Sequence, residues 1–225
     1  MRRLGIFGGT FDPVHDGHLR PAARAAEVFG FDELVFVPAG NPPHKLGEAR
    51  TAFAHRFAML ALATQDDDRG VVSVIEAERD GPTYTIDTLA ALHEAHAGDR
   101  LYFLMGSDSF AQITTWRRWD ELLSLASLVV LRRPTIWGDE LLAGVPPELR
   151  PSVAFVARTA LPSGHEAGPH RVYLLDCEPY PISATEVRQR LGRGLPIGDV
   201  MPATVRRYIE KHRLYRGGEK GADES

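Results

Sequence analysis

Short apolar runs alternate with longer segments of helical periodicity along the first 130 residues of the chain. The runs contain almost no polar residue, which is typical of strands that are buried on both faces of a parallel sheet. They predict five strands, at Leu4–Phe7, Leu34–Val37, Val71–Ile75, Leu101–Met105 and Leu128–Leu131.

Three segments between these strands carry apolar residues at helical spacing, at His18–Phe29, Thr51–Thr64 and Ile86–Ala97. Proline is tolerated in the first turn of a helix, so Pro21 predicts that the first helix begins close to Gly17 or His18. The alternation of strand and helix predicts an α/β fold with a doubly wound, mostly parallel sheet, helices on both faces and right-handed crossovers. Ligands of such folds bind outside the carboxyl ends of the strands, where the strand order reverses.

The pattern weakens between Arg133 and Arg171, where prolines and glycines interrupt it. We expect loops there, with a short helix and a strand near Val153–Val156. Val172–Leu175 predicts a late strand, and two helices follow, at Ala184–Leu191 and Ala203–His212.

The chain length of 225 residues suits one α/β domain with a small appendage. We interpret residues 1–180 as a Rossmann-like core and residues 181–216 as a C-terminal helical segment of the same domain. The polar residues 217–225 are expected to form a disordered tail.

The net charge of −4 is spread along the chain and gives no basic footprint of a nucleic-acid binder. The single cysteine, Cys177, cannot form an intrachain disulfide, and a small buried thiol is the expected role. The N-terminus leads directly into the first strand without the longer apolar region of a signal peptide, and no window is long enough to span a bilayer. We therefore expect a cytoplasmic protein without a nucleic-acid or membrane partner; self-association into a homo-oligomer stays open.

A glycine-rich turn follows the first predicted strand. Gly8 and Gly9 lack a Cβ atom, so the backbone there can approach a phosphate chain and expose its N–H groups. His15 and His18 are three residues apart, near the expected positive end of the first helix, where both rings would converge on an anion. No Gly-Lys-Ser/Thr follows the glycines and no G-x-G-x-x-G is present, so neither a Walker loop nor a dinucleotide fingerprint fits this turn.

The loop after the second strand contains Asn41, His44 and Lys45 around two prolines. The prolines stiffen the chain, so the three side chains can offer hydrogen-bond donors to an anionic group at little entropic cost. A plain surface loop with a solvated lysine is the alternative interpretation.

Further polar groups follow the fourth and fifth strands. Gly106 and Asp108 come at the end of a buried strand, where Asp108 can accept from a ribose hydroxyl, orient a metal or simply cap the next helix. Arg132 and Arg133 follow the fifth strand, and one of them is expected to reach a substrate phosphate unless both are solvated.

Hydroxyl groups also stand before two of the predicted helices. Thr85 precedes the third helix, where threonine is often just a cap. Ser183 and Thr185 begin the helix near residue 184, and Arg188 adds a fixed charge three residues further on. Such a helix start favours phosphate, but an ordinary N-cap with a surface arginine explains it as well.

The stretch GGTFDPVHDGH at Gly8–His18 resembles the T/HxGH signature of the nucleotidylyltransferase α/β phosphodiesterase superfamily, in the form of its nicotinate mononucleotide adenylyltransferase branch. Five further stretches resemble motifs of that branch in the same order, at Pro38–Lys45, Thr83–Leu89, Met105–Asp108 with Trp116 and Trp119, Ile182–Arg188 and Val205–Tyr215. Ala184 stands where many relatives have serine, and the loops from Arg133 to Arg171 carry little resemblance.

This resemblance implies a Rossmann-like nucleotidyltransferase fold and transfer of AMP from ATP to nicotinate mononucleotide, with Mg²⁺ carried by ATP and no metal site of the protein. The implied catalytic residues are His15 and His18, with His18 the stronger candidate. The implied ATP contacts are Gly8, Gly9, Thr10, Phe11, His15, His18, Gly106, Asp108, Ser183, Thr185 and Arg188. The implied contacts of the nicotinate nucleotide are Asn41, His44, Lys45, Thr85, Trp116 and Arg133.

Two of these contacts have a specific chemistry in the family. Thr85 helps to hold the nicotinate carboxylate, partly through backbone N–H groups, and Trp116 stacks on the pyridine ring. Trp119 is expected in the core. The nucleophile is a phosphate oxygen that is already ionised at neutral pH, so no Ser, Cys or Lys nucleophile and no general base is required.

Four alternatives stay open at this point. An adenylyltransferase for the amide nucleotide or for phosphopantetheine shares the phosphate chemistry, although phosphopantetheine enzymes are shorter and lack the paired tryptophans. A class I aminoacyl-tRNA synthetase fragment shares the HxGH theme, but the length, the acidic balance and the missing Lys-Met-Ser-Lys-Ser loop argue against it. A non-catalytic nucleotide sensor on the same fold is the last, and the retention of both histidines speaks against it.

Overall fold

The sheet contains seven strands in the computed structural model, which describes residues 1–42, 50–156 and 169–216. The order is β3-β2-β1-β4-β5-β7-β6, and all neighbouring strands are parallel. The strands are β1 (Arg3–Gly9), β2 (Glu33–Pro38), β3 (Gly70–Val72), β4 (Arg100–Gly106), β5 (Ser127–Leu131), β6 (Val153–Val156) and β7 (Val172–Leu175).

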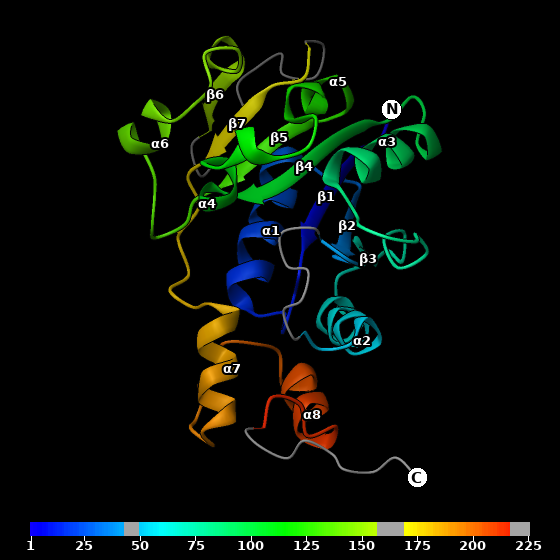
Figure 1. Cartoon of the computed structure of the whole chain (residues 1–225), viewed down its shortest axis with the longest axis vertical. Coiled ribbons are helices and arrows are strands. Elements are labelled where there is room, and N and C mark those ends of the chain that lie inside the picture. Colours follow the sequence, from blue (N-terminus) through cyan, green and yellow to red (C-terminus); the bar gives the residue numbers. More distant parts are fainter. Residues whose placement is uncertain (43–49, 157–168, 217–225) are drawn as a thin grey trace.

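The α-helices occupy the connections between the strands and the C-terminal segment (Figure 1). They are α1 (Asp16–Phe29), α2 (Phe53–Thr64), α3 (Thr85–Ala95), α4 (Ser107–Phe110), α5 (Leu122–Leu125), α6 (Asp139–Ala143), α7 (Ala184–Gly192) and α8 (Ala203–Lys211). Short 3₁₀ turns lie at Ile113–Thr115, Trp119–Glu121 and Arg150–Ser152. Figure 1 shows α7 and α8 at the lower end of the view, beyond the sheet, with α2 beside α8.

Helices cover both faces of the sheet. Because side chains alternate along each strand, neighbouring residues of one strand pack into different cores. In β4, Tyr102 and Leu104 join a core with residues of α1, α2, α7 and α8, whereas Phe103 and Met105 join a second core with residues of α3, α4, α5 and α6. This is the predicted doubly wound α/β fold with helices on both faces. The strand order reverses between β1 and β4, so the crevice between their carboxyl ends is the expected ligand site.

The sequence pattern is confirmed for the strands, with one boundary wrong. The third strand was expected to reach Ile75 but ends at Val72. After Ser73 donates a last hydrogen bond to Phe36, the chain turns, and Val74 is 41% exposed, so apolar composition at this sheet edge does not reflect strand pairing. The strand expected near Val153–Val156, which lies at the sheet edge, and the late strand at Val172–Leu175 are both present.

The start of α1 also differs from the expectation. The helix begins at Asp16, which places Pro21 in its second turn rather than its first. A proline there cannot donate to the carbonyl of Gly17. The guanidinium of Arg133 donates to that carbonyl instead, with Nη1 2.8 Å from the oxygen, and offsets the loss.

The segment between β4 and β5 is not one helix. It consists of α4, two 3₁₀ turns and α5, and Arg118 adopts a positive φ of 52° between the tryptophans. Trp116 and Trp119 therefore do not share a helix face, although both are half-buried against the second core, as expected for Trp119. The tail at residues 217–225 lies outside the described residues, and the boundary near residue 180 stays a prediction. Within the described part of the chain, no helix combines the length and apolar character that crossing a bilayer requires.

Candidate active site

A cavity of about 610 Å³ opens at the carboxyl ends of β1, β2 and β4, where the strand order reverses. The turn after β1 forms one wall, the start of α3 and the segment after β4 form another, and the start of α7 lies across from them. The predicted residues that line it are Gly8, Gly9, Thr10, Phe11, His18, Thr85, Gly106, Asp108, Trp116, Arg133, Thr185 and Arg188.

Other predicted residues lie beside the cavity rather than on its surface. His15 is only 2% exposed, and Ser183 uses its hydroxyl as the N-cap of α7, accepting from the N–H of Glu186. Asn41 exchanges two hydrogen bonds with Thr83, which join the loop after β2 to the loop before α3. His44 and Lys45 lie outside the described residues. The roles of all these residues stay predictions.

The two histidines stack at the start of α1, with ring centroids 3.9 Å apart. His15 is the N-cap, and its Nδ1 accepts from the N–H of Gly17 at 3.1 Å. The N–H of His15 in turn donates to Nδ1 of His18 at 3.3 Å. Because both Nδ1 atoms accept, each neutral ring carries its proton on Nε2, and His18 can donate from Nε2 into the cavity that it lines.

Burial keeps both rings neutral in the free protein. It lowers the pKa of His15 to about 4, and the nearby Arg133 guanidinium acts in the same direction. Burial also lowers the pKa of His18 well below its ordinary value, and repulsion from His15, when that ring is protonated, and from Arg133 acts in the same direction. The cavity wall therefore carries a neutral imidazole donor at His18 together with the guanidinium of Arg133.

Acidification is expected to weaken the fold through His15. Its pKa is about 4 in the folded chain and about 6.5 when unfolded, so between these values the unfolded chain binds a proton that the folded chain does not. This residue therefore leaves the unfolding free energy undiminished above about pH 6.5. As the pH decreases from there, protonation of His15 in the unfolded chain lowers the unfolding free energy by about 3 kcal/mol. Urea unfolding between about pH 7 and pH 4 measures the slope.

The His15→Asn variant is the matched control for this titration. Asparagine is a preferred N-cap, so it keeps an acceptor for the Gly17 N–H but does not titrate. Its unfolding free energy should vary less with pH in the same window. An unchanged slope would contradict the assignment of this titration to His15.

Asp108 and Arg133 lie together over Gly106 at the end of β4. A Cβ atom at residue 106 would lie 2.9 Å from Nε of Arg133 and would collide with the carboxylate of Asp108. Arg133 is held from behind, since its N–H donates to Ser107 and its Nη1 to the carbonyl of Gly17. Of the two candidate arginines, Arg133 lines the cavity, whereas Arg132 pairs with Asp176 at 2.8 Å.

The cavity wall near the start of α3 contains polar groups that the sequence analysis did not name as candidate site residues. The N-cap of α3 is Tyr84 and makes no side-chain cap bond, so the hydroxyl of Thr85 is not the N-cap. The Arg117 guanidinium lies 4.6 Å from the ring centre of Tyr84. The Glu76 carboxylate accepts from the N–H of Gly40 at 3.0 Å and from the hydroxyl of Thr88 at 2.9 Å.

Arg117 had one signal in the sequence, its position directly after Trp116. Glu76 had none, because it lies in a turn without periodicity and reaches the cavity only through the folding of the chain. Tyr84, Glu76 and Arg117 are all part of the cavity wall.

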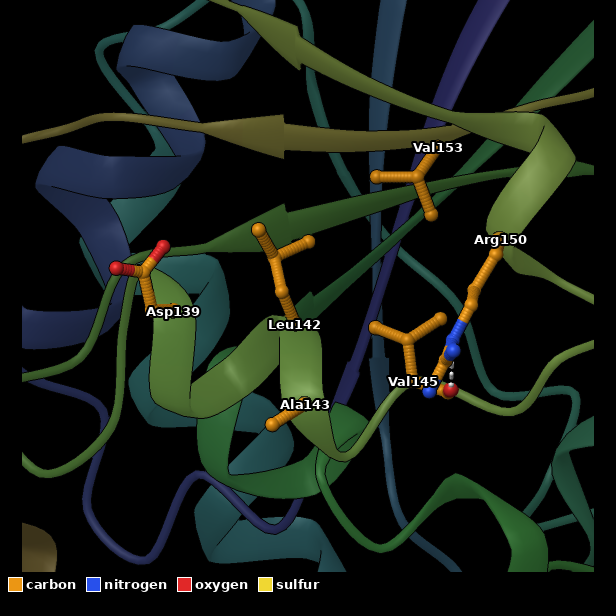
Figure 2. Close-up of a pocket in the computed structure, with 6 residues that line it drawn as sticks. All are labelled: Asp139, Leu142, Ala143, Val145, Arg150 and Val153. Atoms are coloured by element: carbon orange, nitrogen blue, oxygen red, sulfur yellow. Dashed lines mark hydrogen bonds between the residues drawn. The ribbon is translucent and has the colours of Figure 1, made fainter.

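A second hollow, of about 340 Å³, lies between α6 and β6 (Figure 2). Figure 2 shows Asp139 and Arg150 at opposite ends of it, with the side chains of Leu142 and Val145 between them. The Arg150 guanidinium already donates to the carbonyl of Val145 at 3.1 Å. The polar groups of this second hollow do not converge on one point, so the larger cavity is the candidate active site.

The described residues contain no group of three or more His, Cys, Asp or Glu side chains that could hold a metal ion. The Asp12 carboxylate at the cavity is engaged by the hydroxyl of Tyr215 and the N–H of Thr51. Asp108 accepts from the N–H of Ser109 at 2.9 Å.

Known proteins resemble the chain along nearly its whole length. The model of the cytidylyltransferase-like family matches residues 6–190. Relatives named probable nicotinate-nucleotide adenylyltransferase occur in Leifsonia xyli subsp. xyli (40% identical over 215 residues, 95% of this chain and 94% of the relative) and in Pseudomonas aeruginosa (38% over 216 residues, 96% and 98%). A relative from Mycobacterium bovis with the same name is 40% identical over 214 residues, 95% of this chain and 92% of its own length.

Solved structures support the fold independently. Nicotinic acid mononucleotide adenylyltransferase from Plasmodium falciparum, in complex with NaAD, superimposes with a TM-score of 0.70 at 21% identity, over 96% of this chain and 98% of that one. The same enzyme complexed with APC gives a TM-score of 0.69 at the same identity and coverage.

Proposed function

The chain belongs to the cytidylyltransferase-like family and, within it, to the nicotinate-nucleotide adenylyltransferases, and from this we propose that it transfers AMP from ATP to nicotinate mononucleotide. The products are nicotinate adenine dinucleotide and pyrophosphate, a step of NAD biosynthesis. One observation carries the proposal. The cavity at the strand-order reversal is lined by a glycine turn, His18, Arg133 and Arg188 together with Thr85 and Trp116.

The reaction makes one P–O bond and breaks another. An oxygen of the mononucleotide phosphate attacks the α-phosphorus of ATP, and the pyrophosphate leaves with the electron pair of the broken bond. No side-chain nucleophile is required, because the attacking oxygen is already ionised. The protein accelerates the step by aligning the two phosphates and by stabilising charge that develops on the α-phosphate and on the leaving group.

The positions of the side chains support a division of these tasks. The N–H groups from Gly8 to Phe11 and the Nε2–H of His18 lie where an α-phosphate would meet the positive end of α1. Phe11 contributes backbone only, because its ring is buried on Phe7 and His18. Thr185 and Arg188 at the start of α7 hold the leaving phosphates. The backbone N–H of His15 donates to Nδ1 of His18 and so orients that ring.

Mg²⁺ enters this proposal as part of the substrate MgATP. The ion neutralises phosphate charge, and Asp108, which shares the cavity wall with the carboxylates of Asp12 and Glu76, would hold its water shell. A cytoplasmic location and the oligomeric state stay predictions.

Pyrophosphate release tests the function directly. Purified protein is incubated with ATP, Mg²⁺ and, in turn, nicotinate mononucleotide, nicotinamide mononucleotide and phosphopantetheine. We expect the highest kcat/KM with the nicotinate nucleotide. Preference for the amide nucleotide or for phosphopantetheine would overturn the substrate assignment, and tight ATP binding without pyrophosphate release would favour the nucleotide sensor.

Arg117 is expected to favour the acid over the amide nucleotide. Its guanidinium lies over the ring of Tyr84, next to Thr85, and lines the same cavity as Thr85 and Trp116, where a carboxylate gains from a nearby cation and a carboxamide does not. Because the side chain is 53% exposed, the gain is modest, about fivefold. We expect Arg117→Ala to lower kcat/KM for nicotinate mononucleotide by this factor, leaving the amide nucleotide within twofold.

The neighbouring Arg118→Ala variant is the matched control. Arg118 is 50% exposed and lies 3.9 Å from the Asp87 carboxylate, which Arg117 approaches to 4.0 Å. It also pairs with Glu121 but does not line the cavity. It should leave the ratio of the two substrates unchanged. An equal loss of kcat/KM with both nucleotides in Arg117→Ala would show that Arg117 does not discriminate the nicotinate carboxylate from the carboxamide.

A further inference from the structure

The end of the described chain returns to the turn that follows β1. The hydroxyl of Tyr215, four residues beyond the end of α8, donates to Oδ1 of Asp12 at 2.5 Å across 203 positions of sequence. Burial and the bond to this carboxylate raise the pKa of Tyr215, so the phenol stays protonated as a donor. The C-terminal segment is therefore anchored to the turn of the candidate active site.

Asp12 is where four segments of the chain meet. Its side chain is 4% exposed, and its second carboxylate oxygen accepts from the N–H of Thr51 before α2 at 3.2 Å. Its backbone carbonyl accepts from Nη1 of Arg188 in α7 at 2.7 Å. With Tyr215 after α8, these contacts fix the residue from three directions.

The anchored turn holds the groups proposed to meet the phosphates. Phe11 precedes Asp12 and has a positive φ of 50°, a conformation that a residue with a side chain adopts only when its surroundings impose it. The ring of Phe11 lies against the ring of His18, with centroids 5.1 Å apart. A displacement of Asp12 would therefore reach Phe11, His18 and Arg188 together.

We propose that Tyr215 is a positioning residue for phosphate transfer, acting through Asp12 on the turn at Gly9–Asp12 and on Arg188. Tyr215 is absent from the wall of the cavity, so it does not contact the reacting atoms. The proposal rests on the proposed function and deepens it. It makes the C-terminal segment part of the catalytic geometry rather than only part of the core.

The test compares Tyr215→Phe with Tyr208→Phe. Both variants lose one half-buried hydroxyl of the C-terminal segment, but the hydroxyl of Tyr208 bonds Nδ1 of His55 at 2.9 Å, whereas the Asp12 carboxylate accepts from Tyr215 and Thr51. We expect Tyr215→Phe to lower kcat about tenfold, because small misplacement of reacting groups is costly, with KM for nicotinate mononucleotide within twofold. Tyr208→Phe should keep its kcat, while the two variants lose similar thermal stability.

The outcomes separate this proposal from the proposed function. No pyrophosphate release by the wild-type chain would overturn the function itself. An active wild type with equal kcat in both tyrosine variants would overturn the positioning role alone, as would a proportional rise of KM without loss of kcat. If Tyr215→Phe does not fold, Asp12→Asn replaces it, and an unchanged kcat in that variant would overturn the proposal.

Discussion

Replacing His18 with alanine is expected to lower kcat by about 10²–10³, the cost of removing one positioned donor from a developing phosphate charge. His18 is the member of the histidine pair that lines the cavity, and its Nδ1 is occupied by the N–H of His15. Its proton therefore lies on Nε2. Since burial lowers the pKa of the ring, the neutral donor form predominates near neutral pH. Steady-state kinetics with ATP and nicotinate mononucleotide measure the loss.

The His93→Ala variant controls for the loss of an imidazole. His93 is exposed in the last turn of α3, where its Nδ1 contacts the carbonyl of Leu125 far from the cavity. It should retain the kcat of the wild type. Near wild-type turnover in a folded His18→Ala variant would remove His18 from the mechanism.

The fold was predictable because its core depends on local periodicity. Unbroken apolar runs such as Leu101–Met105 meet both faces of a parallel sheet, and period-2 alternation then divides them between the two cores. The prediction was wrong where local pattern and pairing diverge. Val74 is apolar but exposed beyond the edge strand, and Pro21 is tolerated in the second turn of α1 because a distant arginine replaces its missing donor.

The site was predictable where its residues are close in sequence. The turn from Gly8 to His18 brings glycines, helix start and histidines together without help from the rest of the chain. The family resemblance made His18 the stronger candidate, but the geometric difference depends on the fold: His15 makes the cap bond to the Gly17 N–H and lies beside the cavity, whereas His18 lines it. Tyr215 and Arg56 were missed because their partners lie far away in sequence, and tertiary folding alone brings them together.

Replacing Arg56 with alanine is expected to lower the unfolding free energy by about 3–5 kcal/mol. Arg56 is 2% exposed, and its guanidinium donates to three backbone carbonyls. Nε reaches Thr51 at 3.0 Å, Nη1 reaches Thr10 at 2.9 Å and Nη2 reaches Ala39 at 2.8 Å. Alanine would leave these carbonyls without their donors inside the protein, and the penalty of an unsatisfied buried acceptor exceeds the value of an exposed hydrogen bond. Urea unfolding with an unchanged m-value measures the difference.

Arg56 also joins two loops that line the cavity, since Thr10 follows β1 and Ala39 follows β2. Arg56→Lys keeps the charge but cannot present the planar fork to three acceptors, so it should recover only part of the stability. Arg24→Ala is the control, because the Arg24 side chain on α1 is 38% exposed and pairs with Glu27, so its loss should cost no more than about 0.5 kcal/mol. If Arg56→Ala costs as little as Arg24→Ala, the carbonyls find other donors, and Arg56 does not hold the two loops together.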